Sequence, residues 1–276
     1  MINFAPEIIR LNMQSIKILF AAFVAMSLVA CGSSTSKNDK TTVKVGPGLA
    51  INEESFPDLN LQKFFLSQGY GADGAISDEE LQSVTMLDLS NMQLRSLSGI
   101  ERFPNLSVLK LNGNILEEFD VPVIPTLEEL YCANCGMKRL NVKTCPQLRV
   151  LYCQENKLDS LIIDGMPLLE QVEANNNVMK KVVFTDCPQL RTINLASNKL
   201  SAADLSKCGA LYDLNVTDNP LQIENIDVDA FVKNLPKATP SDAVNPPHAP
   251  TIVGLDEGSL SNNNKNMLKQ KGWSLK

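Results

Sequence analysis

The sequence predicts a solenoid, in which each repeat of the chain adds one short strand to a parallel sheet. The first observation is a motif, Leu-x-Leu-x-x-Asn-x-Leu with close variants, that occurs seven times between residues 87 and 221. The second is its spacing, which is 22 residues in the first interval and 21 residues in the other five. The motifs begin at Leu87, Leu109, Leu130, Leu151, Val172, Ile193 and Leu214. A fixed period of this length with this pattern is typical of a leucine-rich repeat solenoid.

The N-terminal 30 residues are predicted to be a signal peptide. Residues 18–30 form a 13-residue apolar stretch, which is short for a membrane span but suits a signal-peptide core. Lys17 supplies the positive region before it if translation starts at Met13. The stretch ends in Leu-Val-Ala-Cys31-Gly, which resembles a bacterial lipobox, so we expect cleavage before a lipid-modified Cys31. An ordinary cleavable signal is the alternative.

Residues 31–52 are polar at their start and are predicted to be a flexible tether behind the lipidated cysteine. Together with the lipobox, this tether predicts a lipid-anchored protein of the cell envelope, at the outer membrane or the cell surface. Contact with the membrane is expected through the lipid alone.

Residues 53–84 are predicted to cap the first repeat. A helix is expected to begin near Phe56 and to contain the apolar residues Leu61, Phe64, Phe65 and Leu66. The following segment, residues 69–81, resembles a degenerate EF-hand loop with three candidate ligands for weakly bound calcium: Asp73, Ser77 and Glu80. Glycines occupy the first and third loop positions, where calcium sites have oxygen ligands, so we expect weak calcium binding or none and a segment that serves as a cap turn.

Residues 85–221 hold the seven repeats. In the first half of each repeat, two apolar residues flank one residue that points to the opposite side, as in a strand with one face in the core. The sixth motif position is Asn in five repeats, and Met92 and Cys135 are the exceptions. A buried Asn can pair with backbone groups where the chain leaves the strand, so a structural ladder is expected rather than a binding role.

The second half of each repeat is predicted to be a short extended segment on the convex side. Apolar residues alternate there, and a 21-residue unit leaves little room for a helix. These segments begin at Leu97, Phe119, Leu140, Leu161, Val182 and Ala203. Because one repeat cannot bury its own apolar face, stability must come from stacking and from caps at both ends.

Six of the seven cysteines occur at fixed positions of the repeat. They replace a core leucine, a ladder Asn or a turn residue: Cys132, Cys135, Cys145, Cys153, Cys187 and Cys208. Cysteine behaves as a small buried hydrophobe in such positions, so free thiols are expected. A Cys132–Cys153 disulfide is the alternative. A metal site is not expected, because Cys132-x-x-Cys135 lacks a second pair and the single histidine, His248, lies in a Pro-rich segment.

Residues 222–276 are predicted to form an irregular C-terminal cap. Helical spacing over residues 226–235 is followed by a Pro-rich loop over residues 236–250. A strand over residues 251–255, a helix over residues 261–271 with Ser261 as N-cap, and a closing strand over residues 273–275 complete the cap.

Three segments before and within the first repeats carry a family resemblance: FPDLNLQKFFLS, DGAISDEELQSVTMLDLS and LRSLSGIERFPNLSVLKL. With the cysteine-containing repeats that follow, residues 53–276 resemble leucine-rich repeat lipoproteins of Bacteroides-like bacteria, and the repeats resemble those of internalin J-type surface proteins. The resemblance implies a right-handed, curved β/α solenoid at the cell envelope that binds other molecules without catalysis. The chain departs from it in its weak calcium positions and in having only seven short repeats.

The composition favours a binding protein over an enzyme or a nucleic-acid partner. The chain of 276 residues has a net charge of −6 and no basic stripe, which argues against nucleic acid. No histidine lies near a serine or cysteine in sequence, and phosphate-loop and nucleophile-elbow motifs are missing, so neither catalysis nor a cofactor is expected. We expect a monomeric recognition or adhesion module for a protein, peptide or glycan; a structural or accessory subunit of an outer-membrane complex is the alternative.

The ligand is expected on the concave face, where the residues flanking the core positions point outward. Tyr131 and Tyr152 are predicted to lie side by side on neighbouring strands, and exposed tyrosines are common at binding surfaces. The residues expected around them are Lys110, Glu129, Val150, Gln154 and Glu173. The alternative is that the tyrosines simply suit a strand surface and pair across it.

Overall fold

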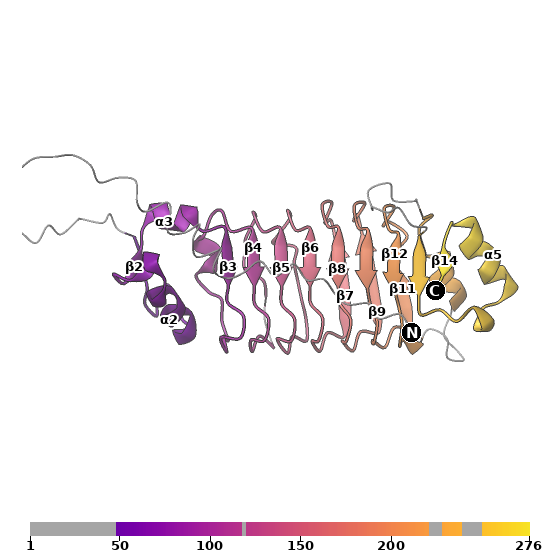
Figure 1. Ribbon diagram of the computed structural model, residues 1–276, viewed down its shortest axis with the longest axis horizontal. Helices are drawn as coiled ribbons and strands as arrows, with labels where there is room; N and C mark the ends of the chain where they lie inside the picture. Colours follow the sequence, from indigo (N-terminus) through magenta and orange to yellow (C-terminus); the bar gives the residue numbers. More distant parts are fainter. Residues whose placement is uncertain (1–47, 118–119, 221–227, 239–249) are drawn as a thin grey trace, which may run out of the picture. The chain divides into compact units, whose positions relative to one another are not determined.

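The computed structural model describes residues 48–117, 120–220, 228–238 and 250–276 (Figure 1). The chain divides into two units, residues 1–44 and residues 45–276, and all described residues belong to the second unit. The predicted signal peptide, Cys31 and the tether up to residue 47 lie outside the described residues. In the described ranges, no helix has the length and hydropathy needed to cross a lipid bilayer.

The main element is a nine-stranded parallel sheet, in the order β14-β13-β12-β10-β8-β6-β5-β4-β3 (Figure 1). Each repeat contributes the strand predicted for it, so the leucine-rich repeat solenoid is confirmed. The strands of the repeats are β3 Met86–Asp88, β4 Val108–Lys110, β5 Glu129–Tyr131, β6 Val150–Tyr152, β8 Gln171–Glu173, β10 Thr192–Asn194 and β12 Asp213–Asn215.

The register of this sheet follows the motif. Leu130 is the Cα partner of Leu109 on one side and of Leu151 on the other, and Leu151 in turn pairs with Val172. The middle residue of every repeat strand is buried, whereas its two neighbours are half-buried or exposed. Alternating side chains therefore separate a continuous apolar core from an outward face made of three aligned columns of residues.

The predicted Asn ladder is present. The Asn156 amide accepts hydrogen bonds from the backbone N–H groups of Cys135 (2.9 Å) and Met137 (3.0 Å) in the preceding repeat. It also donates to the carbonyls of Cys132 (2.8 Å) and Cys153 (3.0 Å). The side chains of Asn114, Asn177, Asn198 and Asn219 bridge neighbouring repeats in the same way. One side chain thus satisfies backbone groups that the tight turn leaves unpaired.

Each repeat also makes a left-handed turn just before the ladder position. In all seven repeats the fifth motif residue has a positive φ, between 53° and 73°: Asn91, Gly113, Asn134, Glu155, Asn176, Ser197 and Asp218. Glycine, asparagine and aspartate adopt this conformation most easily, and they occupy five of the seven positions. The turn aims the ladder side chain back toward the core.

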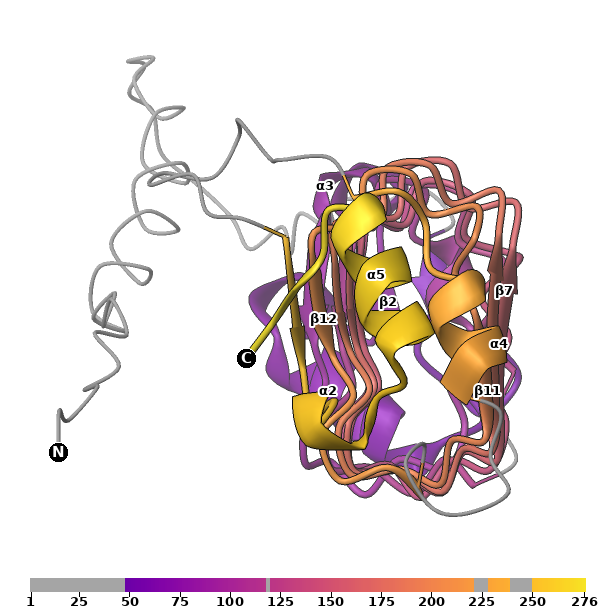
Figure 2. The same cartoon turned by 90° about the vertical axis from the view of Figure 1, so that its right-hand side faces the viewer.

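Within the described residues, the second half of the repeat forms a strand in three consecutive repeats. There, β7 Ser160–Asp164, β9 Lys181–Thr185 and β11 Ala202–Asp204 form a three-stranded parallel sheet. Figure 2 shows this sheet and the main sheet as opposite walls, with β12 on one side and β7 and β11 on the other.

For the first repeat, the expectation of an extended segment was wrong, because residues 100–102 form a 3-10 helix, η2 Ile100–Arg102. The chain turns at Gly99, which has a φ of 104°, and a Cβ there would lie 2.3 Å from the Ser55 carbonyl oxygen. The close approach of the N-terminal cap therefore sets this local path. The segment after Leu140 is not assigned as a strand either, and Phe119 lies outside the described residues.

The N-terminal cap contains β1 Leu49–Ala50, α2 Leu59–Ser67, η1 Gly69–Gly71, β2 Ala75–Ile76 and α3 Asp78–Ser83. As predicted, α2 buries Leu61 and Phe65, and the Phe65 ring lies 4.7 Å from Phe56 and 5.3 Å from Phe103, centroid to centroid. Leu66, in the same helix, is 45% exposed.

Two further details of the cap differ from, or refine, the sequence analysis. Leu49 and Ala50, assigned to the tether, pair antiparallel with β2, and Ile51 is buried in the core. In the EF-hand-like segment, Ser77 caps α3, the Glu80 carboxylate accepts a hydrogen bond from the Ser77 N–H (2.8 Å), and Asp73 accepts one from the Ala75 N–H (3.2 Å). All three calcium candidates are thus used in local turn and helix-capping bonds.

The C-terminal cap holds α4 Val228–Lys233, β13 Thr251–Val253, η4 Glu257–Ser259, α5 Asn262–Gln270 and β14 Ser274–Leu275. The predicted helix with Ser261 as N-cap is present. The strands extend the main sheet, because β13 pairs in parallel with β12, and β14 with β13. The sheet thus outlasts the sequence period, which ends at residue 221.

The six cysteines within the described ranges are buried free thiols, as predicted. The alternative, a disulfide between Cys132 and Cys153, is not formed. Burial raises the pKa of the Cys153 thiol and of the Cys208 thiol to about 12, because the thiolate would lose its hydration. The same cause raises the pKa of Cys132. These thiols therefore stay protonated at neutral pH and serve as packing groups.

Candidate functional site

Two tyrosines stand next to each other on the outward face of the main sheet. Tyr131 ends β5, Tyr152 ends β6, and the two residues are Cα partners in the register. Their ring centroids are 5.0 Å apart and their planes are inclined at 72°, an edge-to-face arrangement. Such pairs are favoured by the aromatic quadrupole, so the two rings hold each other in place.

Hydrogen bonds fix both hydroxyl groups. The Tyr131 hydroxyl donates to Glu129 Oε2 at 2.7 Å, two residues earlier on the same face of β5. The Tyr152 hydroxyl accepts from Gln171 Nε2 at 2.9 Å, and the same amide donates to Glu173 Oε1 at 3.3 Å. Each ring is thus tied to its surroundings by a polar neighbour as well as by the other ring.

A cation borders the pair on the side of the preceding repeat. Lys110, at the end of β4, places its Nζ 5.7 Å from the centroid of the Tyr131 ring. This distance lies within the range of a cation–π interaction, which attracts the ammonium group to the ring face. Lys110 is the Cα partner of Tyr131, so adjacent strands position the contact.

Both tyrosines remain protonated at neutral pH. The pKa of Tyr131 is raised above its usual value by burial first, and then by its hydrogen bond to the Glu129 carboxylate. The pKa of Tyr152 is also raised, by burial and then by the negative charge of Glu173. The surface therefore presents neutral, amphipathic rings bordered by carboxylates.

The structure brings Tyr131, Tyr152, Glu129 and Lys110 into direct contact, whereas Glu173 joins them through Gln171. We refer to these six residues, Lys110, Glu129, Tyr131, Tyr152, Gln171 and Glu173, as the tyrosine site. Of the other two predicted residues, Val150 is half-buried between Glu129 and Gln171 in the register. Gln154 lies farther along the outward face, with its Oε1 buried and without a hydrogen-bond partner in the described part of the chain.

The sequence analysis did not include Gln171 among the site residues. Its position two residues before Glu173 on the same strand face carried the necessary information. The register places it beside Val150, and its long side chain reaches diagonally to the Tyr152 hydroxyl.

The outward face continues past the tyrosine site into a shallow polar hollow. It has a volume of about 230 Å³ and lies over β8, β10, β12 and β13, with Glu173 and Asp213 among its lining residues. Across the described ranges, no three or more His, Cys, Asp or Glu residues gather in a way that could hold a metal ion. The chemistry available on this face is aromatic contact, hydrogen bonding, the negative charge of carboxylates and the positive charge of Lys110.

The sheet register, the seven aligned strands and the Asn ladder define the chain as a leucine-rich repeat protein. No family model matches the sequence, and no curated protein matches it.

Solved structures similar to this chain include internalins and YopM. Internalin F of Listeria monocytogenes is 20% identical over 83% of this chain and 71% of its own, with a TM-score of 0.48. The functional domain of internalin J from the same species, described as including a cysteine ladder, is 20% identical over 77% of this chain and 58% of its own, with a TM-score of 0.41.

YopM of Yersinia enterocolitica is 27% identical over 49% of this chain, with a TM-score of 0.43. The match spans only 29% of the length of YopM. Because these TM-scores are below 0.5, the assignment of the fold rests on the period and register of this chain.

Proposed function

We propose that this protein is a lipid-anchored recognition or adhesion module of the cell envelope, which binds a protein, peptide or glycan at the tyrosine site. The observation that carries the proposal is the pair of half-buried tyrosines, fixed edge to face and by hydrogen bonds on an open sheet. Rigid aromatic side chains offer a large contact area at a small entropic cost. Stacking on a sugar ring or packing against a peptide side chain would both use this surface.

The tyrosine site is expected to lose its ligand when both rings are removed. The Tyr131→Ala, Tyr152→Ala double variant should lose capture of hits from a glycan array and a panel of extracellular proteins, because it lacks the main contact area. Its thermal unfolding should stay close to that of the wild type, since both side chains lie on the outward face.

The matched control is Ile162→Ala with Val183→Ala, which removes two neighbouring outward residues from the three-stranded sheet. This control should bind as the wild type does. Full capture by the tyrosine variant would exclude the tyrosine site as the binding surface. Replacing both tyrosines with Phe then separates the contribution of the hydroxyl groups from that of the rings.

The anchor is supported by the apolar stretch over residues 18–30 and by the lipobox-like sequence that ends at Cys31-Gly32. In bacterial cells, the wild-type chain should partition with the membrane fraction and carry a lipid mass on Cys31. The Cys31→Ser variant should carry no lipid and should keep its uncleaved N-terminal segment, because cleavage is expected only before a lipid-modified cysteine. A wild-type protein without lipid, or a Cys31→Ser variant that is still cleaved after Ala30, would contradict the anchor.

A second candidate function is that of an accessory subunit of an outer-membrane complex. Among the described residues, the three most exposed large apolar ones, Leu59 (66%), Val123 (61%) and Ile162 (56%), all lie away from the tyrosine site. Such residues are often covered by a permanent partner. Copurification of one partner at fixed stoichiometry from detergent-solubilised envelopes would favour this function, and a monomer in that extract would exclude it.

A further inference from the structure

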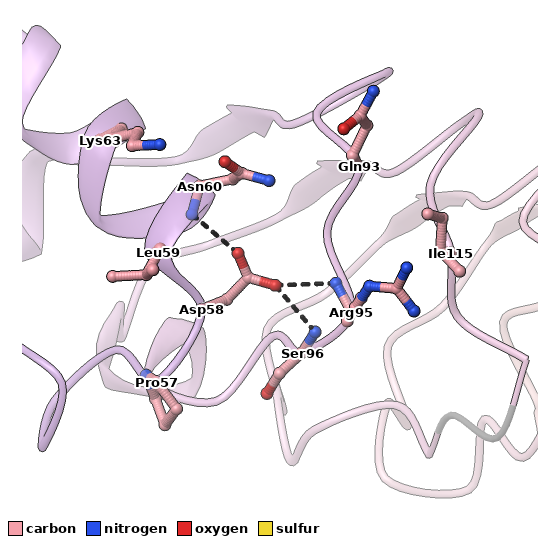
Figure 3. A pocket seen from close by; sticks show the side chains of 9 residues that line it. All are labelled: Pro57, Asp58, Leu59, Asn60, Lys63, Gln93, Arg95, Ser96 and Ile115. Atoms are coloured by element: carbon pink, nitrogen blue, oxygen red, sulfur yellow. Dashed lines mark hydrogen bonds between the residues drawn. The ribbon is translucent and has the colours of Figure 1, made fainter.

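A separate hollow lies where the N-terminal cap meets the first two repeats (Figure 3). Its volume is about 460 Å³. One wall comes from the start of α2 and the residues before it, and the other from the loops that follow β3 and β4. None of its lining residues belongs to the tyrosine site, so it offers an independent surface.

One carboxylate, that of Asp58, forms hydrogen bonds with both walls. Asp58 Oδ1 accepts hydrogen bonds from the backbone N–H groups of Asn60 (2.9 Å) and Leu61 (3.3 Å) at the start of α2. Asp58 Oδ2 accepts from the N–H groups of Arg95 (2.7 Å) and Ser96 (3.2 Å) in the first repeat (Figure 3). The hollow is therefore preformed, and four N–H donors already disperse the charge of this acid.

Two cations also line the hollow. Lys63 and Arg95 are both exposed and come from opposite walls (Figure 3). Neither side chain takes part in an ion pair with the described residues. In a chain with a net charge of −6, this hollow is thus a local site for a negatively charged group.

Apolar side chains stand beside these cations. Leu59 is 66% exposed and Ile115 is 37% exposed, one on each wall. Burial of such surface by a partner is favourable in proportion to the area removed from water. The amide side chains of Asn60 and Gln93 also line the hollow and can pair with the backbone of an extended peptide.

We propose that this hollow docks an acidic segment of a partner protein, in which Asp or Glu carboxylates alternate with aliphatic side chains. The carboxylates pair with the Arg95 guanidinium and the Lys63 ammonium group, and Arg95 can receive a carboxylate in bidentate fashion. The aliphatic side chains cover Leu59 and Ile115. This combination of charge and apolar surface fits such a peptide better than an inorganic anion, which would leave the apolar residues uncovered.

The proposal is tested with the full-length mature chain and a fluorescently labelled, end-blocked peptide, Leu-Glu-Leu-Asp-Leu-Glu, by fluorescence anisotropy. This peptide is expected to bind at least tenfold more tightly than its amide analogue Leu-Gln-Leu-Asn-Leu-Gln and than its glycine analogue Gly-Glu-Gly-Asp-Gly-Glu. The Lys63→Ala, Arg95→Ala variant should weaken binding at least tenfold. Because both side chains are exposed, its thermal unfolding should match that of the wild type.

The matched control is Lys157→Ala with Lys199→Ala, which removes two exposed cations from turns of later repeats and changes the net charge equally. It should bind the peptide as the wild type does. The proposal fails if the three peptides bind alike, if none binds at millimolar concentration, or if the control loses affinity as much as the test variant. It also fails if Lys63 and Arg95 instead govern binding to phosphatidylglycerol vesicles while the peptide does not bind.

Discussion

Replacing Leu151 with Ala should lower the free energy of unfolding by about 2–5 kcal/mol, the usual range for a large-to-small substitution in a packed core. Leu151 is fully buried and lies at the centre of β6, where its Cα partners are Leu130 and Val172. The cavity would open in the middle of the stack, between Leu130 and Val172. Urea unfolding followed by circular dichroism measures the effect.

The matched control for this prediction is the adjacent residue. Val150 belongs to the same strand but points to the outward face and is half-buried. Val150→Ala should therefore cost clearly less than Leu151→Ala. Equal losses, or a larger loss for Val150→Ala, would show that the register of β6 is different from the one described.

Replacing Asn156 with Ala should destabilise the protein by about 3 kcal/mol or more, because each buried polar group left without a partner costs about 1–3 kcal/mol. The substitution leaves the N–H groups of Cys135 and Met137 and the carbonyl of Cys132 without the hydrogen bonds that Asn156 makes to them. The Cys153 carbonyl keeps a hydrogen bond from the Asn177 amide (3.1 Å). Alanine fills the space poorly and offers neither a donor nor an acceptor. The measurement is again the free energy of unfolding in urea.

Asn175→Ala provides the comparison for Asn156→Ala. Asn175 is half-buried on the outward face, and its side chain accepts one long hydrogen bond from Asn194 Nδ2 (3.4 Å). Its loss should cost less than about 1 kcal/mol, the net value of one ordinary hydrogen bond. If both variants had the same free energy of unfolding, the prediction that the Asn ladder stabilises the fold would be wrong.

The strands of the main sheet were predictable because one interval repeats through the chain. A residue such as Leu130 is placed by its neighbours 21 residues away on both sides, Leu109 and Leu151, so a local ambiguity is resolved by the period. The second half of the repeats keeps the same interval, but the interval alone does not decide whether a segment is a strand or a turn. There the backbone conformation depends on contacts with other parts of the chain. At Gly99, for example, the N-terminal cap lies so close that a Cβ would contact the Ser55 carbonyl oxygen.

The tyrosine site was predictable in composition but not in geometry. Alternation along β5 and β6 places Tyr131 and Tyr152 on one face, and the constant period makes them neighbours. The edge-to-face packing and the link from Tyr152 through Gln171 to Glu173 depend on side-chain rotamers. Rotamers follow from packing around the site, which no single-strand pattern contains.

Two features were visible in the sequence and missed. Small or polar residues at the fifth motif position, such as Asn134, Asn176 and Asp218, indicate a left-handed turn in every repeat. Leu49 and Ile51, the apolar residues closest to the cap, indicate that ordered structure begins before residue 53. A short pair of strands carries little periodicity, so two apolar residues in a polar segment are easily assigned to a linker.

Because the repeats from β4 to β12 have a constant interval, the length of the outward face can change only by whole repeats. Losing or gaining one whole unit would shorten or lengthen that face by about 4.8 Å, the distance between neighbouring strands, while every remaining column stays aligned. A partial unit would instead bring apolar side chains out of line with their neighbours. Duplication or deletion of complete repeats would therefore let such a chain match partners of different length. The packing of the core and both caps would stay unchanged.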